Sequence, residues 1–272
     1  MNTIGFGTFR LKSELYELLP FAAENGYSLI DASDDYFNEE YVAGANTLDM
    51  KIMTKFSYAN KALKFDEVFN KTEKLFTDNG KKIGCYLIHW PYPYIYKKIW
   101  RKIEDLYLSG RVSEIGVCNF TVKHLESLLS DCRVKPIYNE IELHPLFQQR
   151  GITEYCKKNG IKIISYSPFA RMDKQLIEAP VILELSDKYN TSVLNIILKW
   201  NLQKGFIPIP STSKVNHIKE MSLGILDSFE LTNNEIELID ALECGKRVRF
   251  DPDNYFTFKT KLKLRIISLI MR

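Results

Sequence analysis

The sequence has few cysteines, and their arrangement argues against two kinds of site. Its 272 residues include five cysteines and no Cys-x-x-Cys pair. An odd, scattered set provides neither a disulfide framework nor a zinc site, so we expect no metal and a reducing compartment, the cytoplasm. The five are Cys85, Cys118, Cys132, Cys156 and Cys244.

Long apolar runs and a strong charge bias are also missing. No stretch is long enough to span a bilayer, and Met1 and Asn2 lead straight into TIGFGTF without a secretory leader, so we expect no stable membrane insertion. The formal net charge of +3 is too small to predict a nucleic-acid partner. The composition that remains, 45% hydrophobic and 26% charged residues, is ordinary for a globular protein and provides a large core.

Strand-like and helix-like patterns alternate along the chain. Eight short apolar segments predict strands, at residues 3–7, 28–32, 51–54, 84–89, 115–119, 137–142, 162–166 and 206–210. Amphipathic patterns between them predict helices, for example at residues 13–25, 66–77 and 100–109. Glycine, which tolerates the left-handed conformation that ends many helices, follows several of them. These glycines are Gly26, Gly80, Gly110, Gly160 and Gly205.

This alternation predicts an α/β fold with parallel strands and right-handed crossovers. Eight such units take about 250 residues in a (β/α)8 TIM barrel, which would fill this chain. We therefore expect a single domain over residues 1–272, with residues 245–272 as a C-terminal loop and a basic amphipathic tail. A Rossmann fold is disfavoured because Gly5 and Gly7 are followed by no third glycine at the required spacing.

Polar side chains recur where the predicted strands end. Active sites of (β/α)8 barrels lie at the carboxyl ends of the strands, so these side chains should meet at one mouth of the barrel. They are Asp31, Lys55, His89, Cys118, Asn119, Glu140, Tyr166, Ser211 and Thr212. The agreement between strand pattern and polar pattern favours a catalytic site over scattered surface residues.

The stretch LIDASDDYFNEE presents a tyrosine just past one strand end. Tyr36 follows Asp31 by five residues. A phenol has a pKa of roughly 10 and needs a nearby cation to give up its proton at neutral pH. Lys55 and His89, at two later strand ends, are the candidate cations. Taken singly, each of these residues has an ordinary alternative role, as a packing tyrosine, a helix cap, a rim lysine or a core histidine.

Six motifs, in this order, resemble those of the aldo-keto reductase family. They are DxxxxYxNE at 31–39, MTK ending at Lys55, LIHWP at 87–91, GVCNF at 116–120, NEIELHP at 139–145 and SYSP at 165–168. The resemblance implies hydride transfer from a reduced nicotinamide cofactor to a carbonyl carbon. It implies Tyr36 as the proton donor and Lys55 as the cation that lowers the tyrosine's pKa. Asp31 would hold Lys55, and His89 would orient the carbonyl group.

The resemblance also implies cofactor-binding residues. Asn119 and the preceding Cys118 would hydrogen-bond the nicotinamide carboxamide, and Tyr166 would stack on the ring. The remaining members of this set are Gly7, Thr8, Ser167 and Pro168. The family has serine at the position of Cys118, and a thiol is a weaker hydrogen-bond donor than a hydroxyl.

Glu140 is a larger departure, because the family has glutamine there, also in contact with the carboxamide. A carboxylate accepts hydrogen bonds but donates none unless it is protonated. Two hypotheses follow. Either Glu140 favours the cationic, oxidised cofactor, or burial holds it protonated.

The segment IPIPSTSKVNHIKEM, at the last predicted strand, resembles the family's adenosine-phosphate loop. Ser211 stands where the family has lysine, and His217 where it has arginine. Lys214 is the candidate to replace these cations, with Thr212 as a further ligand and Glu220 as an adenine contact. The loop leaves two alternatives, NADP(H) as the family's usual cofactor and NAD(H).

A short loop follows His89 and predicts an open substrate pocket. Phe9, Trp90 and Tyr92 are expected to line it, and aromatic walls suit a small carbonyl compound. The intact catalytic residues favour a reductase that acts as a monomer or a weak homo-oligomer. The alternative is a cofactor-binding redox-sensing or partner-binding subunit with little or no turnover, since a fold does not determine a function.

The tail KTKLKLRIISLIMR, residues 259–272, is basic and amphipathic. Leu262, Ile266, Leu269 and Ile270 fall on one helical face. Two alternatives follow. The tail is a helix docked on the barrel or on a second subunit, or it associates weakly with an anionic membrane.

Overall fold

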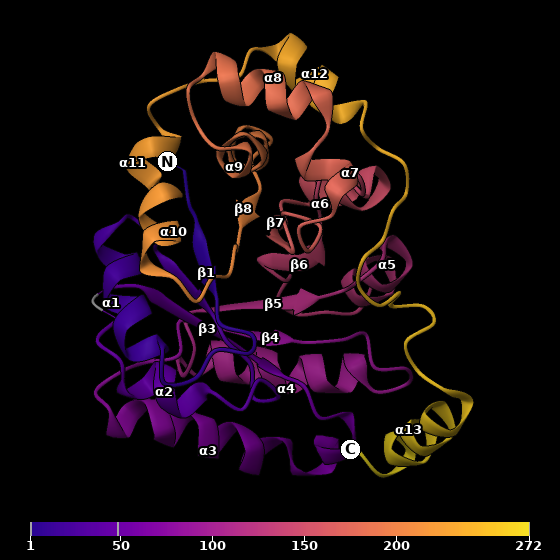
Figure 1. The fold of residues 1–272 in the computed structure, drawn as a ribbon. Coiled ribbons are helices and arrows are strands. Elements are labelled where there is room, and N and C mark those ends of the chain that lie inside the picture. Colours follow the sequence, from indigo (N-terminus) through magenta and orange to yellow (C-terminus); the bar gives the residue numbers. More distant parts are fainter. Residues whose placement is uncertain (1, 48, 272) are drawn as a thin grey trace.

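The computed structural model describes residues 2–47 and 49–271, and eight parallel strands form its centre (Figure 1). The strands are β1 Gly5–Gly7, β2 Leu29–Asp31, β3 Lys51–Phe56, β4 Cys85–Ile88, β5 Glu114–Cys118, β6 Tyr138–Glu142, β7 Lys162–Tyr166 and β8 Ile207–Pro208. They pair in chain order, each with the next. The Gly7 amide then donates a hydrogen bond to the Pro210 carbonyl at 2.9 Å, which brings the last strand back to the first. The predicted (β/α)8 barrel is confirmed.

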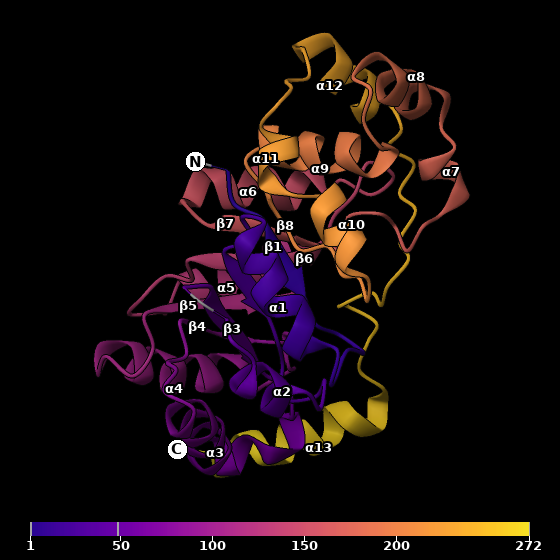
Figure 2. The ribbon, with the colours of Figure 1, turned by 60° about the vertical axis from the view of Figure 1, so that its left-hand side comes forward.

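Helices surround the strands and bury their apolar faces against them (Figures 1 and 2). They are α1 Leu15–Glu24, α2 Glu39–Gly44, the 3-10 helix η1 Ala59–Lys64, α3 Phe65–Asp78, α4 Tyr96–Leu108, α5 Val122–Leu129, α6 Arg150–Asn159, α7 Lys174–Ile177, α8 Pro180–Lys188, α9 Val193–Gln203, α10 Val215–Glu220, α11 Leu223–Leu226, α12 Asn233–Asp240 and α13 Phe258–Ile270. Helix α4 begins before the expected residue 100, because Ile99 already belongs to its buried stripe. The five predicted helix-ending glycines have φ between +70° and +87°.

The inside of the barrel is apolar below and polar at the mouth. Its apolar cluster consists of Leu29, Met53, Cys85, Leu87, Tyr138, Ile164 and Ile209. Side chains two residues apart on a strand share a face. Asp31 therefore follows Leu29 on the inward face of β2, Lys55 follows Met53 on β3, and Glu140 follows Tyr138 on β6. This period of two explains why the polar residues meet at the carboxyl ends of the strands.

The segment between α12 and α13 runs across the mouth of the barrel. The buried carboxylate of Glu142 anchors it by accepting hydrogen bonds from the amides of Val248, at 2.6 Å, and Arg249, at 3.1 Å. Further along, Tyr255 stacks on Trp90 with ring centroids 4.0 Å apart. The loop after His89 is short, as expected, but this segment covers the side that it would have left open.

Helix α13 docks on the barrel against η1 and next to α4. Lys98 donates hydrogen bonds to the carbonyls of Ser268, at 2.7 Å, and Met271, at 2.6 Å. Leu264 and Met271 are buried beneath the helix. The inner face of the tail helix therefore docks on the barrel, as the first alternative expects. None of the helices within residues 2–47 and 49–271 is long and apolar enough to cross a membrane.

Candidate active site

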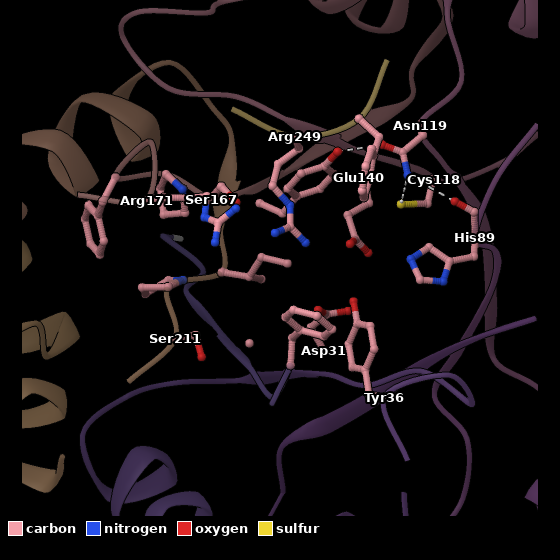
Figure 3. A pocket seen from close by; sticks show the side chains of 18 of the residues that line it. Asp31, Tyr36, His89, Cys118, Asn119, Glu140, Ser167, Arg171, Ser211 and Arg249 are labelled. Atoms are coloured by element: carbon pink, nitrogen blue, oxygen red, sulfur yellow. Dashed lines mark hydrogen bonds between the residues drawn. The ribbon is translucent and has the colours of Figure 1, made fainter. Parts of the chain in front are cut away.

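Four residues from three strand ends form the centre of the mouth, and Figure 3 labels three of them, Asp31, Tyr36 and His89. Lys55, on β3, is fully buried and makes an ion pair with Asp31 at the end of β2. Its ammonium also donates hydrogen bonds to the Ala32 carbonyl at 3.1 Å and to the Tyr36 hydroxyl at 3.3 Å. The rings of Tyr36 and His89 meet edge to face, with centroids 5.9 Å apart. The sequence-predicted tetrad is thus brought together in space.

The Tyr36 phenol is protonated at rest. Burial raises the pKa of Tyr36 well above its usual value, and the neighbouring Asp31 carboxylate raises it further. Lys55 acts in the expected direction and lowers this pKa, but burial outweighs it. For Lys55, burial acts in the opposite direction and lowers the pKa. Asp31 and Glu140 outweigh burial and raise the pKa of the ammonium group well above its usual value. The site therefore holds a neutral phenol against a permanent cation.

The His89 imidazole is held by groups on its Nδ1 side. Nδ1 lies 2.7 Å from Ser57 Oγ, 3.3 Å from Ser33 Oγ and 3.4 Å from an Asp35 oxygen. Burial lowers the pKa of His89, although Asp35 opposes this shift, so the ring is neutral at pH 7. Its Nε2 has no polar partner among the described residues, and His89 lines the cavity. A neutral ring with a free Nε2 suits hydrogen bonding to a bound ligand.

Sequence reasoning missed this set of supporting residues. Ser33 and Asp35 lie within the DASDDY stretch, and the Ser33 hydroxyl donates to Asp35 at 2.6 Å. Ser57 follows Lys55 by two residues, so its proximity to the mouth was readable from the strand period.

A polar wall lies beside the tetrad. The Tyr166 hydroxyl donates to Asn119 Oδ1 at 2.7 Å, and Asn119 Nδ2 donates to the His89 carbonyl at 3.1 Å and to Cys118 Sγ at 3.1 Å. Burial raises the pKa of Cys118 well above its usual value, so the side chain is a neutral thiol. The wall fixes the Asn119 amide in one orientation.

Glu140 completes this wall. Its Oε2 lies 3.4 Å from the Lys55 ammonium and has no hydrogen-bond partner among the described residues. Burial, reinforced by Asp31, raises the pKa of Glu140 to about 8, although Lys55 opposes the shift. A mostly protonated Glu140 at pH 7 can both donate and accept, as the family's glutamine does.

The mouth opens into a cavity of about 280 Å³. Predicted residues that line it are Gly7, Phe9, Asp31, Tyr36, His89, Trp90, Cys118, Asn119, Glu140, Tyr166, Ser167, Pro168 and Ser211. Lys55 lies behind this lining, next to Asp31. Thr8 is also behind it, where its hydroxyl donates to the Asp31 carbonyl at 2.8 Å.

Tyr92 was expected in the substrate pocket, and this expectation is wrong. The side chain is buried away from the cavity lining. Its hydroxyl donates to the Phe56 carbonyl at 3.3 Å, and its ring packs edge to face on Phe56 and Phe256. The C-terminal segment, which supplies Phe256, completes this apolar environment.

Apart from Ser211, the predicted phosphate-loop residues lie outside the cavity lining, on or just before α10. Thr212 Oγ1 is 3.1 Å from His217 Nδ1 and accepts the Lys214 amide at 3.1 Å. Lys214 and Glu220 are exposed. Ser211 connects this loop to the cavity, because it lines the end of the cavity next to Gly7.

Two cavity-lining arginines were not predicted. Arg171 comes from the loop after β7, where Ala170, Arg171 and Met172 all have positive φ. Arg249 comes from the segment anchored by Glu142. A basic residue in a loop carries no periodic signal. For Arg171 the sequence gave one indication, its proximity to the SYSP motif, and for Arg249 it gave no indication.

The barrel and the site at its mouth define an oxidoreductase of the α/β-barrel class. A family model described as "Aldo/keto reductase family" matches residues 3–243, and the chain belongs to that family.

Individual proteins agree with this assignment. The chain is similar to "Glyoxal reductase" of Bacillus subtilis (strain 168), with 36% identity over 260 residues and 93% of each chain covered. It is similar to "Methylglyoxal reductase DkgA" of Escherichia coli (strain K12), with 33% identity over 264 residues and 94% of each chain covered. Among solved structures, it is similar to a variant of Gox0644 in complex with NADPH. The TM-score is 0.86 at 27% identity, with 94% of this chain and 95% of that chain covered.

Proposed function

We propose that this protein is an NADP(H)-dependent reductase of small reactive carbonyl compounds, with 2-oxoaldehydes such as methylglyoxal as model substrates. The observation that carries the proposal is the buried Lys55 ammonium, 3.3 Å from a neutral Tyr36 phenol that faces the cavity. The names of the similar glyoxal and methylglyoxal reductases support the substrate class.

The residues of the wall fit a nicotinamide cofactor. Glu140 Oε2 is buried and lacks a hydrogen-bond partner among the described residues, so it is available to a carboxamide. Asn119 and Cys118 lie on the same side, and the Tyr166 ring lines the cavity as a stacking surface. Ser211, Thr212, Lys214 and His217 would take the phosphate end. The bound cofactor supplies the hydride, and the NADPH complex of the similar structure supports NADP(H).

Tyr36 then supplies the proton to the carbonyl oxygen. The phenolate that forms is stabilised by Lys55, which is already aligned by Asp31, so little reorganisation accompanies the transfer. His89 Nε2 hydrogen-bonds the same oxygen and orients the substrate. Asp31 keeps Lys55 charged, so the cation is already in place when negative charge develops on Tyr36.

The test is NADPH oxidation, followed at 340 nm, with methylglyoxal and glyoxal and with NADH in parallel. We expect turnover of both compounds and preference for NADPH. Tight NADPH binding without turnover of any carbonyl compound would instead support the cofactor-binding subunit. A preference for NADH would refute the NADP(H) assignment, because Ser211 and His217 would then have removed the phosphate site.

A further inference from the structure

The cavity contains two guanidinium groups that the proposed reaction does not use. Arg171 and Arg249 both line it (Figure 3). Neither makes a side-chain hydrogen bond or an ion pair within the described chain. Arg247 is different, because its guanidinium lies 3.8 Å from the Glu142 carboxylate and over the Phe147 ring. Arg247 therefore has a structural role, whereas the other two present unpaired charges to the cavity.

Arg249 is held in place by its backbone. The carboxylate of Glu142 is buried and accepts the amides of Val248 and Arg249, and such charge-assisted bonds are among the stronger ones in proteins. The guanidinium of Arg249 stands over the Phe9 ring, with Cζ 5.5 Å from its centroid. The arginine is thus positioned before any ligand arrives.

Phe9 connects Arg249 to the proton donor. The Phe9 ring meets the Tyr36 ring edge to face with centroids 5.1 Å apart. A ligand whose carbonyl oxygen lies at Tyr36 and His89 therefore passes along Phe9 before it reaches Arg249. The spacing of about one aromatic ring suits an anionic group a few bonds away from the carbonyl carbon.

The charge of the lining favours an anion. Its two carboxyl groups are those of Asp31 and Glu140. Asp31 is paired with Lys55, and Glu140, whose pKa is raised to about 8 by burial, is mostly protonated at pH 7. The two arginines are therefore uncompensated, and a cavity lined by one sign of charge attracts ligands of the opposite sign.

We propose that Arg249 binds an anionic group, in the simplest case a carboxylate, carried by the carbonyl substrate. This inference rests on the proposed reductase function and goes beyond it, because glyoxal and methylglyoxal are uncharged. Arg249 is then the specificity-determining residue that favours carboxylated aldehydes over neutral ones of the same shape.

A matched substrate pair tests the proposal. The compounds 4-carboxybenzaldehyde and methyl 4-formylbenzoate share the ring and the aldehyde and differ in charge. We expect a higher kcat/KM for the acid in the parent protein. The acid-to-ester ratio is the kcat/KM for the acid divided by the kcat/KM for the ester. In Arg249→Gln this ratio should fall by about ten- to a hundredfold, through a higher KM for the acid, because a hydrogen-bonded charge pair is lost. Arg249→Lys should recover part of it.

Arg10→Gln is the matched control. Arg10 also approaches Phe9, with Cζ 5.3 Å from the ring centroid, but it is exposed and does not line the cavity. Its acid-to-ester ratio should stay at the parent value. An equal ratio in the parent and in Arg249→Gln would overturn the proposal. A change in NADPH affinity with no change in that ratio would also overturn it, because Arg249 would then serve the cofactor.

Binding of benzoate separates this proposal from the reductase function. Absence of NADPH oxidation with both aldehydes would refute the reductase function. Benzoate binding, measured by calorimetry, would still decide the role of Arg249. Weaker binding in Arg249→Gln than in Arg10→Gln supports an anion site, and equal binding in both variants overturns it.

A second, independent observation concerns the outer face of α13. Four apolar side chains form an exposed strip on this face. Their exposed fractions are 83% for Phe258, 52% for Leu262, 54% for Ile266 and 84% for Leu269. The helix also carries Lys259, Lys261, Lys263 and Arg265, and it has no acidic residue. On a helical wheel the basic residues fall on both sides of this apolar strip.

We infer that this face docks on an anionic lipid surface. An apolar strip bordered by basic residues is the arrangement of helices that lie in a membrane interface. A second copy of the same face fits less well, because self-pairing would bring like charges together. The inner face stays on the barrel through Leu264 and Met271, so docking requires no unfolding of the helix.

Co-sedimentation with vesicles tests this second inference. We expect binding to vesicles of phosphatidylcholine and phosphatidylglycerol in equal parts at low salt, and none to phosphatidylcholine alone. The double variant Leu262→Gln, Leu269→Gln should bind at least about tenfold more weakly. Equal sedimentation with both kinds of vesicle, or by both proteins, would overturn the inference. Light scattering provides a further check. A dimer of the parent protein that is absent in the double variant would also overturn the inference, because a second copy of the chain would then cover this face.

Discussion

The protonation of Glu140 makes a prediction that separates it from the family's glutamine. With a pKa of about 8, roughly one tenth of the side chains are ionised at pH 7 and roughly nine tenths at pH 9. At pH 7 the protonated form hydrogen-bonds as glutamine does, so Glu140→Gln should bind NADP+ and NADPH in the same ratio as the parent protein. At pH 9 the parent acquires a carboxylate that favours the cationic, oxidised cofactor.

The size of the effect follows from one charge at a buried position. Even at an effective dielectric constant of about 20, a pair of charges several ångströms apart interacts by about 2–3 kcal/mol, or more than tenfold in affinity. The parent's preference for NADP+ over NADPH should therefore rise by about tenfold or more between pH 7 and pH 9. The preference of Glu140→Gln should stay flat over the same range.

The assay is titration of each cofactor, by NADPH fluorescence and by calorimetry for NADP+, from pH 6.5 to pH 9. Glu24→Gln, at an exposed position on α1, is the control and should follow the parent. A pH-independent ratio in the parent, or a parallel change in Glu140→Gln, would refute the assignment of this titration to Glu140.

Three further substitutions test one member of the tetrad, Lys55, and two residues outside it. Lys55→Met leaves Asp31 buried without its cation, so we expect a loss of about 3–5 kcal/mol in the free energy of unfolding and of at least about a hundredfold in kcat; a melting temperature within a degree of the parent would contradict this. Ser57→Ala removes the 2.7 Å contact of His89 and should lower kcat/KM by about fivefold, the equivalent of one hydrogen bond, while NADPH affinity stays constant. Ser211→Lys restores a cation at the phosphate loop and should raise NADPH affinity relative to NADH by about tenfold; an unchanged ratio would show that the 2′-phosphate does not lie at this loop.

The strand ends were predictable because of their period. An inward apolar residue fixes which later residue faces the mouth, so Leu29 and Met53 determine the positions of Asp31 and Lys55. The helix-ending glycines were predictable for a similarly local reason, since their φ is positive. These features depend on neighbours in sequence, which a single chain reveals.

The remaining parts of the site depend on contacts between distant segments. Arg249 reaches the cavity only because Glu142, more than a hundred residues earlier, binds its backbone. Tyr92 turns away from the cavity because Phe256 supplies an apolar surface for its ring. The expectation that Lys55 would give Tyr36 a low pKa had the correct sign for that pair, but it left out burial, which only the folded structure reveals.

The measurement that tests the central claim most directly is the turnover of methylglyoxal and NADPH by Tyr36→Phe, with NADPH affinity determined on the same preparation. Tyr16→Phe is the control, because Tyr16 is an exposed tyrosine on α1. We predict that kcat/KM falls by about a thousandfold in Tyr36→Phe, the usual range for loss of a general acid, while NADPH affinity and the Tyr16 variant stay at parent values. Retention of parent turnover by Tyr36→Phe would contradict the assignment of Tyr36 as the proton donor.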